Sequence, residues 1–136
     1  MDAGTEKRAI QPPGWPRPKG YSNGMVAEGR LLVTGGLIGW DENERFPSDD
    51  FVDQVRRTLA NTVQVLASGG AGPEHIVRMT WYITDKREYL QRQGDIGAAY
   101  RETIGRHFPA MAVIEVAGLL EDRAKVEIET TAVIPA

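Results

Sequence analysis

The chain has 136 residues, 41% of them hydrophobic and 26% charged, a length and composition typical of a single folded domain. It has no cysteine, which excludes disulfides, thiolate catalysis and cysteine-based zinc sites, and its net charge of −3 argues against a protein that binds nucleic acid. No apolar segment is long enough to cross a membrane and the first residues lack the pattern of a signal peptide, so we expect a cytoplasmic protein without a membrane partner.

The first segment, residues 1–20, is rich in proline, with four prolines, two on each side of Trp15. Proline fixes φ and has no backbone N–H, which excludes a regular helix or a central strand here. We expect an extended arm that lies on the surface or reaches a neighbouring molecule. Residues 21–136 are then expected to form a single domain.

Two strands are expected next, over residues 21–27 and 30–35. A two-residue connection at Glu28-Gly29 would join them as a hairpin. The aliphatic residues of the second segment are typical of a buried strand. Residues 37–47 lose this pattern and are expected to form a loop.

A helix is the most regular feature of the sequence. Apolar residues recur at helical spacing between Phe51 and Leu66, which gives this segment one apolar face. The Ser-Asp-Asp run at residues 48–50 supplies an N-cap and first-turn acids. The glycine pair at residues 69–70 supplies a left-handed cap at the other end.

The rest of the chain predicts a strand, a second helix and two further strands. Residues 76–84 are dense in β-branched and aromatic side chains. Asp85, with a glutamate three positions later, resembles a capping box that opens a helix ending before Pro109. The last two strands are expected over residues 110–117 and 125–133.

Side chains of the last strand alternate between charged and apolar. The apolar side should pack on the two helices, which leaves the charged side uncovered. Nothing else in a chain of this length can cover that side. We therefore expect a mixed α/β (α+β) sheet with two helices on one face, and an oligomer that covers the other.

Neither a metal nor a cofactor is expected from the motifs. The glycine-rich segments match neither the dinucleotide fingerprint nor the phosphate loop. His75 and His107 lie far apart, without the spacing of metal ligands. Two strand carboxylates remain as candidates for chemistry, Glu115 and Glu127, and each is either an ion-pair partner on an open face or a proton-transfer group in a pocket.

Three segments, at residues 76–85, 108–117 and 125–129, resemble the RidA (YjgF-like) family of enamine/imine deaminases. The order of the expected elements agrees with this resemblance, which covers about residues 20–134. It implies a chorismate-mutase-like α/β fold. It also implies a homotrimer with a small-molecule pocket in each cleft between neighbouring subunits.

The resemblance also assigns roles to individual residues. In active members of the family, an arginine directly after Phe-Pro-Ala binds the substrate carboxylate through paired hydrogen bonds; this chain has Met111 there. The family's pocket serine and asparagine correspond to Gly35 and Gly97, whereas Tyr21 and Glu127 match the family. In those members the glutamate positions or activates the water that attacks the imine carbon. The expected site is catalytic Glu127 with a substrate-binding set of Tyr21, Gly35, Gly97, Met111, Ala112 and Val113.

We expect hydrolysis of a reactive enamine or imine with release of ammonia, on a substrate bulkier or less anionic than aminoacrylate, such as an aminomuconate-like compound. A carboxylate on that substrate would need another cationic partner, and nothing in the sequence chooses between Arg78, Arg101 and Arg123. One alternative is a non-catalytic trimer that binds an apolar or aromatic metabolite beside the adaptable Met111. Ribonuclease activity, also attributed to this family, is disfavoured by the acidic balance.

Overall fold

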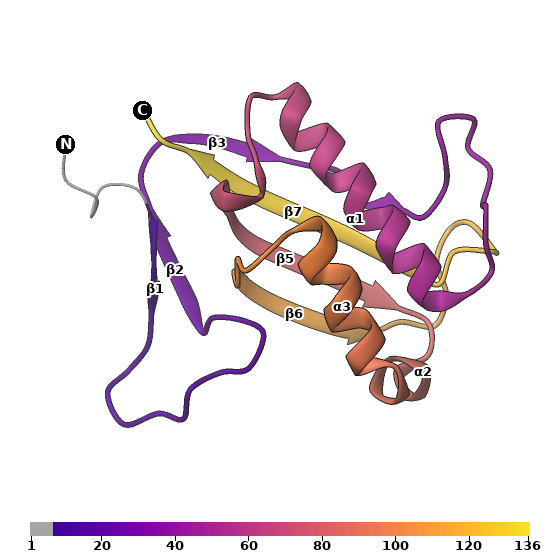
Figure 1. Cartoon of the computed structure of the whole chain (residues 1–136), viewed down its shortest axis with the longest axis horizontal. Helices are drawn as coiled ribbons and strands as arrows, with labels where there is room; N and C mark the ends of the chain where they lie inside the picture. Colours follow the sequence, from indigo (N-terminus) through magenta and orange to yellow (C-terminus); the bar gives the residue numbers. More distant parts are fainter. Residues whose placement is uncertain (1–6) are drawn as a thin grey trace.

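The computed structural model describes residues 7–136, which form a mixed sheet covered on one face by helices (Figure 1). The strands are β1 (Lys7–Ile10), β2 (Gly24–Ala27), β3 (Arg30–Val33), β4 (Leu37–Ile38), β5 (Ile76–Ile83), β6 (Ala110–Glu115) and β7 (Val126–Ile134), and the helices are α1 (Phe51–Ser68), the 3₁₀ turn η2 (Pro73–His75), α2 (Lys86–Gln91) and α3 (Gln93–Thr103). No helix within these residues is long and apolar enough to cross a membrane.

The main sheet has the strand order β3-β7-β5-β6, and the short β4 also pairs with β7. β5 and β6 are parallel, whereas β7 is antiparallel to each of its partners. The long helices α1 and α3 lie on the same face of this sheet (Figure 1). The prediction of a mixed α+β sheet with two main helices on one face is therefore confirmed.

The core lies between these helices and the sheet. Leu59 and Leu66 of α1 are fully buried, as the helical spacing of apolar residues predicts, and Trp81 of β5 is 1% exposed. The alternation predicted for the last strand is also confirmed. Its side chains that are buried beneath the helices are Val126, Ile128, Thr130 and Ala132.

The helix caps lie where the sequence predicts them. Asp50 is the N-cap of α1 and accepts a hydrogen bond from the backbone N–H of Asp53 at 3.0 Å. Asp85 caps α2 by accepting from two backbone N–H groups of its first turn. Gly70 closes the C-terminus of α1 with a φ of 85°, a conformation that a residue with a β-carbon adopts only with strain.

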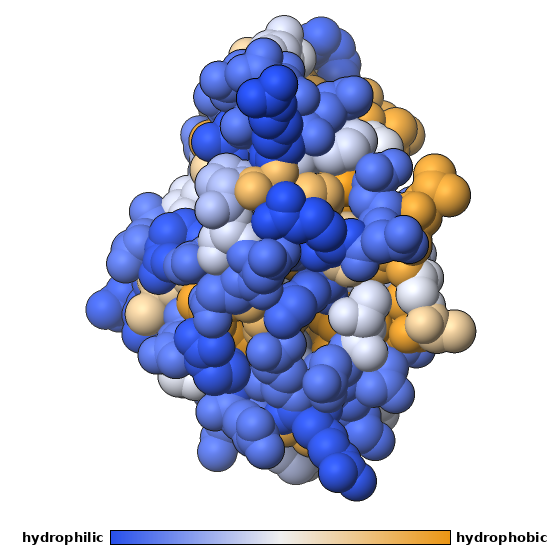
Figure 2. Space-filling model, turned by 90° about the vertical axis from the view of Figure 1, so that its right-hand side faces the viewer, coloured by the Kyte–Doolittle hydropathy of each residue, from blue (hydrophilic) through white to orange (hydrophobic). Residues whose placement is uncertain are grey.

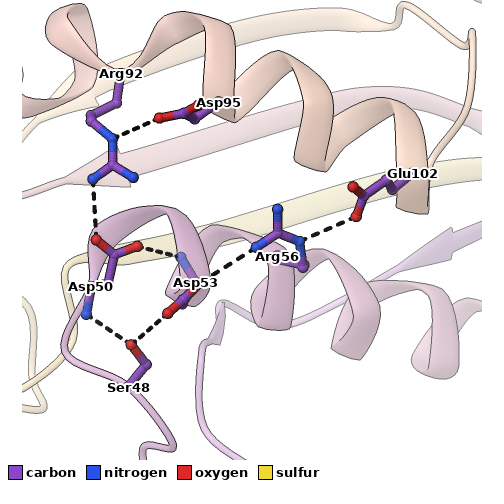
Figure 3. A network of polar contacts seen from close by, with 7 residues as sticks. All are labelled: Ser48, Asp50, Asp53, Arg56, Arg92, Asp95 and Glu102. Atoms are coloured by element: carbon purple, nitrogen blue, oxygen red, sulfur yellow. Dashed lines mark hydrogen bonds and ion pairs between the residues drawn. The ribbon is translucent and has the colours of Figure 1, made fainter.

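A network of polar contacts joins α3 to α1 (Figure 3). Nη1 of Arg92, at the start of α3, lies 3.1 Å from Oδ1 of Asp50, and Nε of the same residue lies 2.9 Å from Oδ2 of Asp95. Near the other end of α3, Oε2 of Glu102 lies 3.2 Å from Nε of Arg56. These pairs are partly exposed and each stabilises little alone, but together they link both ends of α3 to α1.

The hairpin predicted across Glu28-Gly29 is wrong. β2 pairs with β1 in a separate two-stranded sheet, whereas β3 pairs with β7 in the main sheet. Gly29 turns the chain from one sheet to the other with a φ of 145°, and it leaves no room for a β-carbon against the carbonyl of Ile134. Pairing with β7 places Leu32 beside Ala132, where it packs on the core.

Two further predictions need correction. The single helix predicted after Asp85 is two helices, because the backbone leaves helical geometry at Arg92, with φ −112° and ψ 21°. Gly94 favours this break, since glycine is a weak helix former. The loop predicted over residues 37–47 contains β4, because Ile38 is buried and its strand pairs with β7.

Part of the N-terminal arm is built into the fold. β1 pairs along its whole length with β2, and this hairpin extends from one end of the main sheet (Figure 1). Residues 11–23, which include the four prolines, connect the two strands, and Trp15 is exposed. The first six residues of the predicted arm lie outside the described residues.

The second face of the main sheet carries no helix, and we call it the open face. On β3 it presents Leu31 and Val33, which are 69% and 63% exposed, and on β6 it presents the exposed Ile114. Glu127 and Glu129 of β7 lie between these apolar side chains. Figure 2 shows hydrophobic groups along the right-hand edge, away from the helices, beside a surface that is mostly hydrophilic. Such a surface is typical of a contact between molecules.

Candidate functional site

Tyr21 is held next to the start of β6 by its neighbour Ser22. The N–H of Ser22 donates to the carbonyl of Pro109 at 3.0 Å, and its hydroxyl donates to the carbonyl of Phe108. Ser22 also forms a parallel bridge with the first residue of β6. The segment of Tyr21 therefore lies beside the strand that carries Met111.

Tyr21 and Met111 line a pocket of about 430 Å³ formed by β5, β6, α2, α3 and the segment before β2. Two ring pairs build its walls: Trp81 meets Tyr89 edge-on at 6.5 Å, and Tyr100 stacks on Phe108 at 6.5 Å. We call it the aromatic pocket. Its defining side chains are Tyr21, Trp81, Tyr89, Tyr100, Phe108 and Met111.

The buried tyrosines of the aromatic pocket are neutral. Burial raises the pKa of Tyr89 and of Tyr100, because a phenolate would lose its hydration. The Tyr100 hydroxyl donates to the backbone carbonyl of His107, which fixes its position. These side chains offer ring surface to a ligand, and neither is a general base at neutral pH.

Glu127 lies in a different hollow, of about 690 Å³. Its strand places it between Ile38 of β4 and Tyr82 of β5. Glu129, two residues on, accepts a hydrogen bond from the Tyr82 hydroxyl at 2.7 Å, whereas Glu127 has no hydrogen-bond or ion-pair partner within residues 7–136. We call this the Glu127 hollow, and it is also lined by Gly36, Trp40, Arg57, Asn61 and Glu121.

The structure brings some of the predicted site residues together and separates others. Glu127 lines its own hollow, and Gly35 is an exposed residue next to Gly36. Ala112 pairs with Thr80 and, because side chains alternate along a strand, it faces the open face. Four of the predicted residues line the aromatic pocket: Tyr21, Gly97, Met111 and Val113.

The sequence patterns miss several residues that give the aromatic pocket its chemistry. Helical spacing assigns Tyr89 and Tyr100 to the core, because a residue at the wall of a pocket has the same periodicity as a core residue. Lys19 lies in the proline-rich arm and carries no signal at all. Both Lys19 and Arg101 line the aromatic pocket, although the sequence does not point either side chain toward it.

No three His, Asp or Glu side chains within residues 7–136 lie close enough together to hold a metal ion. His75 instead accepts a hydrogen bond from the N–H of Gly72 at 3.0 Å, which closes the turn before β5. The Glu127 hollow carries four carboxylates, of Asp41, Glu42, Glu121 and Glu127, beside Arg57. The aromatic pocket carries aromatic rings and the basic side chains of Lys19 and Arg101.

Comparison with known proteins decides the family. The family model described as Endoribonuclease L-PSP matches residues 16–134 of this chain. The chain belongs to the RidA/YjgF family. This result confirms the family resemblance seen in the sequence.

Relatives of this RidA-family chain include a named deaminase and several solved structures. The 2-iminobutanoate/2-iminopropanoate deaminase of Salmonella typhimurium is 30% identical over 77% of this chain and 80% of its own length. YyfB from Yersinia pestis, a Rid-family protein of unknown function, has a TM-score of 0.84 at 27% identity, covering 95% of this chain and 99% of its own. Escherichia coli TdcF, crystallised with bound serine, has a TM-score of 0.66 at 28% identity, with coverage of 98% and 97%.

Proposed function

We propose that this RidA-family protein hydrolyses a reactive enamine or imine and releases ammonia, in a pocket between subunits of a homotrimer. The observation that carries the proposal is the position of Glu127. The Glu127 side chain is half-buried on the open face and has no hydrogen-bond or ion-pair partner within residues 7–136. Its carboxylate lies in the space that Gly36 leaves free because glycine has no side chain. A carboxylate in this setting is available to bind and activate water.

The reaction requires one water and one group that moves protons. Glu127 accepts a proton as the water oxygen bonds to the imine carbon, and a proton passes to the nitrogen. The carbon–nitrogen bond of this adduct then breaks to give a carbonyl compound and ammonia, so an imine and a water are consumed together. An enamine enters the same route after it takes up a proton on carbon and loses one from nitrogen, which converts it to an imine.

The separation of the two hollows supports a site shared between subunits. Within one chain, the aromatic pocket of Tyr21 and Met111 does not include Glu127. The exposed Leu31 and Val33 of the open face provide apolar surface for a neighbouring copy. A neighbour packed on this face would cover Glu127, in accord with the trimer that the family implies.

One observation favours a second candidate, a non-catalytic trimer that binds an apolar or aromatic metabolite. Met111 has no hydrogen-bond donor, and its flexible thioether adapts to irregular apolar ligands. The aromatic walls of the pocket suit such ligands equally well. The two candidates differ in turnover, which only the first requires.

Ammonia release from freshly generated imines, from small aliphatic to aromatic, tests the proposal. We expect Glu127→Gln to lower kcat/KM by about 100-fold or more, since positioned acid–base groups contribute factors of that order. Glu129→Gln is the matched control, because it neutralises a carboxylate on the same strand and face. Full activity in Glu127→Gln would overturn the role of this residue.

A Met111→Arg variant, assayed beside the wild type, separates the two candidates. If the water-activating site is intact, this variant should turn over small anionic imines that the wild type leaves unchanged, because a guanidinium binds a carboxylate through paired hydrogen bonds. Turnover in neither protein, on any imine of the series, would favour the non-catalytic binder.

A further inference from the structure

The aromatic pocket carries positive charge that no acid balances. Lys19 and Arg101 line it, and none of its lining residues is Asp or Glu. Neither basic side chain forms an ion pair within residues 7–136, although the chain as a whole carries a net charge of −3. A pocket of this composition attracts an anion.

Of the three arginines that the sequence leaves as candidates to bind a carboxylate, the structure selects one. Arg123 is held by Asp49, with Nε 2.9 Å from Oδ1, and its guanidinium covers the ring of Phe46. Arg78 lies on β5 and does not line the aromatic pocket. Arg101 lines it together with Met111.

Gly97 gives Arg101 its position. The two residues are one turn apart on α3, and a β-carbon on Gly97 would lie 3.4 Å from Nη1 of Arg101. The guanidinium therefore extends over the space that a side chain at residue 97 would fill. Met111 places no charge on β6, whereas Gly97 leaves room on α3 for the charge of Arg101. The residues at positions 97 and 111 are therefore linked through Arg101.

We propose that Arg101, assisted by Lys19, binds the carboxylate of a bulky or aromatic imino acid whose side chain packs on the rings of the aromatic pocket. The proposal rests on the proposed function, since it names the substrate class of that site. A guanidinium and an ammonium that line the same pocket suit a carboxylate. The volume of about 430 Å³ and the walls of Trp81, Tyr89, Tyr100 and Phe108 suit an aromatic side chain.

Binding of a stable product analogue tests this without relying on turnover. Three probes are titrated by calorimetry into the full chain: phenylpyruvate, pyruvate and phenylacetone, which keeps the ring and lacks the carboxylate. We expect phenylpyruvate to bind at least about 10-fold more tightly than either of the others, because it alone offers both the ring and the charge. Equal binding of phenylpyruvate and phenylacetone would overturn the proposal, and so would no binding of phenylpyruvate.

Substitutions then identify the basic side chain that binds the carboxylate of phenylpyruvate. Arg101→Met should weaken phenylpyruvate binding about 10-fold or more and leave phenylacetone unchanged, whereas Arg101→Lys should recover part of the loss. Arg106→Met is the control, because this exposed arginine follows α3 and does not line the pocket. Unchanged phenylpyruvate binding in Arg101→Met would overturn the role of Arg101.

The same variants distinguish this proposal from the proposed function. Glu127→Gln should retain phenylpyruvate binding and lose turnover. If no imine is hydrolysed but phenylpyruvate binding still depends on Arg101, the deaminase proposal fails and the carboxylate site stands. If aromatic imines are hydrolysed equally well by wild type and Arg101→Met, the deaminase proposal stands and the carboxylate site fails.

Discussion

The α-carbon of Gly36 lies directly against the carboxylate of Glu127, and a β-carbon on Gly36 would overlap Oε2 of that side chain. Gly36 does not have a positive φ, so its backbone accepts other residues and only the space beside it is special. The glycine therefore sets where the carboxylate of Glu127 can lie. A substitution at Gly36 therefore tests the position of the Glu127 carboxylate without straining the backbone.

Gly36→Ala should displace the carboxylate of Glu127 and lower kcat/KM for imine hydrolysis by about 10-fold or more, since misplacing a catalytic group by about 1 Å is costly. The free energy of unfolding should change by less than about 1 kcal/mol, because the group that must move is the end of a flexible side chain. Gly118→Ala is the control, since a β-carbon there meets nothing within 4 Å and this glycine lines neither the Glu127 hollow nor the aromatic pocket. Equal loss in both variants would contradict a specific effect on Glu127.

A lysine on the open face should break the expected trimer. Leu31→Lys would bury an unpaired charge where a neighbouring copy packs, and we expect sedimentation velocity to show monomers in place of trimers. Leu90→Lys is the matched control, because Leu90 is also an exposed leucine, on α2 and away from the open face. A Leu31→Lys protein that sediments like the wild type would remove the open face as the interface, and a monomeric wild type would remove the trimer itself.

Helices and strands that a local residue pattern specifies could be predicted from the sequence. The apolar spacing after Phe51 gives α1, the N-cap falls on Asp50, and alternation gives the two sides of β7. Strand partners could not be predicted in this way. Arg30 pairs with Ile134, at the other end of the chain, and no local pattern distinguishes this partner from the nearer β2.

The contacts of the Gln54 side chain also could not be predicted from the sequence. It is 1% exposed within α1, and its amide donates to the carbonyls of Ser48 and Arg123 at 3.1 Å and 2.9 Å. Its oxygen accepts from the N–H of Lys125 at 2.8 Å, so one side chain joins α1 to the segment before β7. The sequence shows only a polar residue on a helix, because all these partners come from outside the helix.

Where a motif is present, candidate site residues can be named from the sequence, and these assignments stay predictions. Family resemblance assigns Tyr21, Met111 and Glu127 from short matching segments. It does not show that one chain places Glu127 apart from the other two, because that depends on how strands and loops are arranged in space. Nor does it show Arg101, since an exposed helical arginine has no pattern that points it toward a pocket.

The charge of Asp50 should make stability depend on pH in the acid range. The N–H of Asp53 and then the guanidinium of Arg92 hold the pKa of this carboxyl below its ordinary value. A lowered folded-state pKa means that the stabilisation is present above the ordinary aspartate value of about 3.9 and is lost as pH falls through the folded-state value. Asp50→Asn keeps a capping oxygen and removes only the charge.

We therefore expect Asp50→Asn to lower the free energy of unfolding by about 0.5 kcal/mol at pH 7, a small value because the ion pair is partly exposed and screened. The difference from wild type should shrink toward zero as the pH falls below about 3.9, because the wild-type carboxyl is then increasingly protonated. Urea unfolding at pH 7, 5, 4 and 3, at one protein concentration, measures this. Asp122→Asn, at an exposed aspartate on the loop before β7, should show no such trend. A difference that stays constant or grows toward acid would rule out the charge of Asp50 as its source.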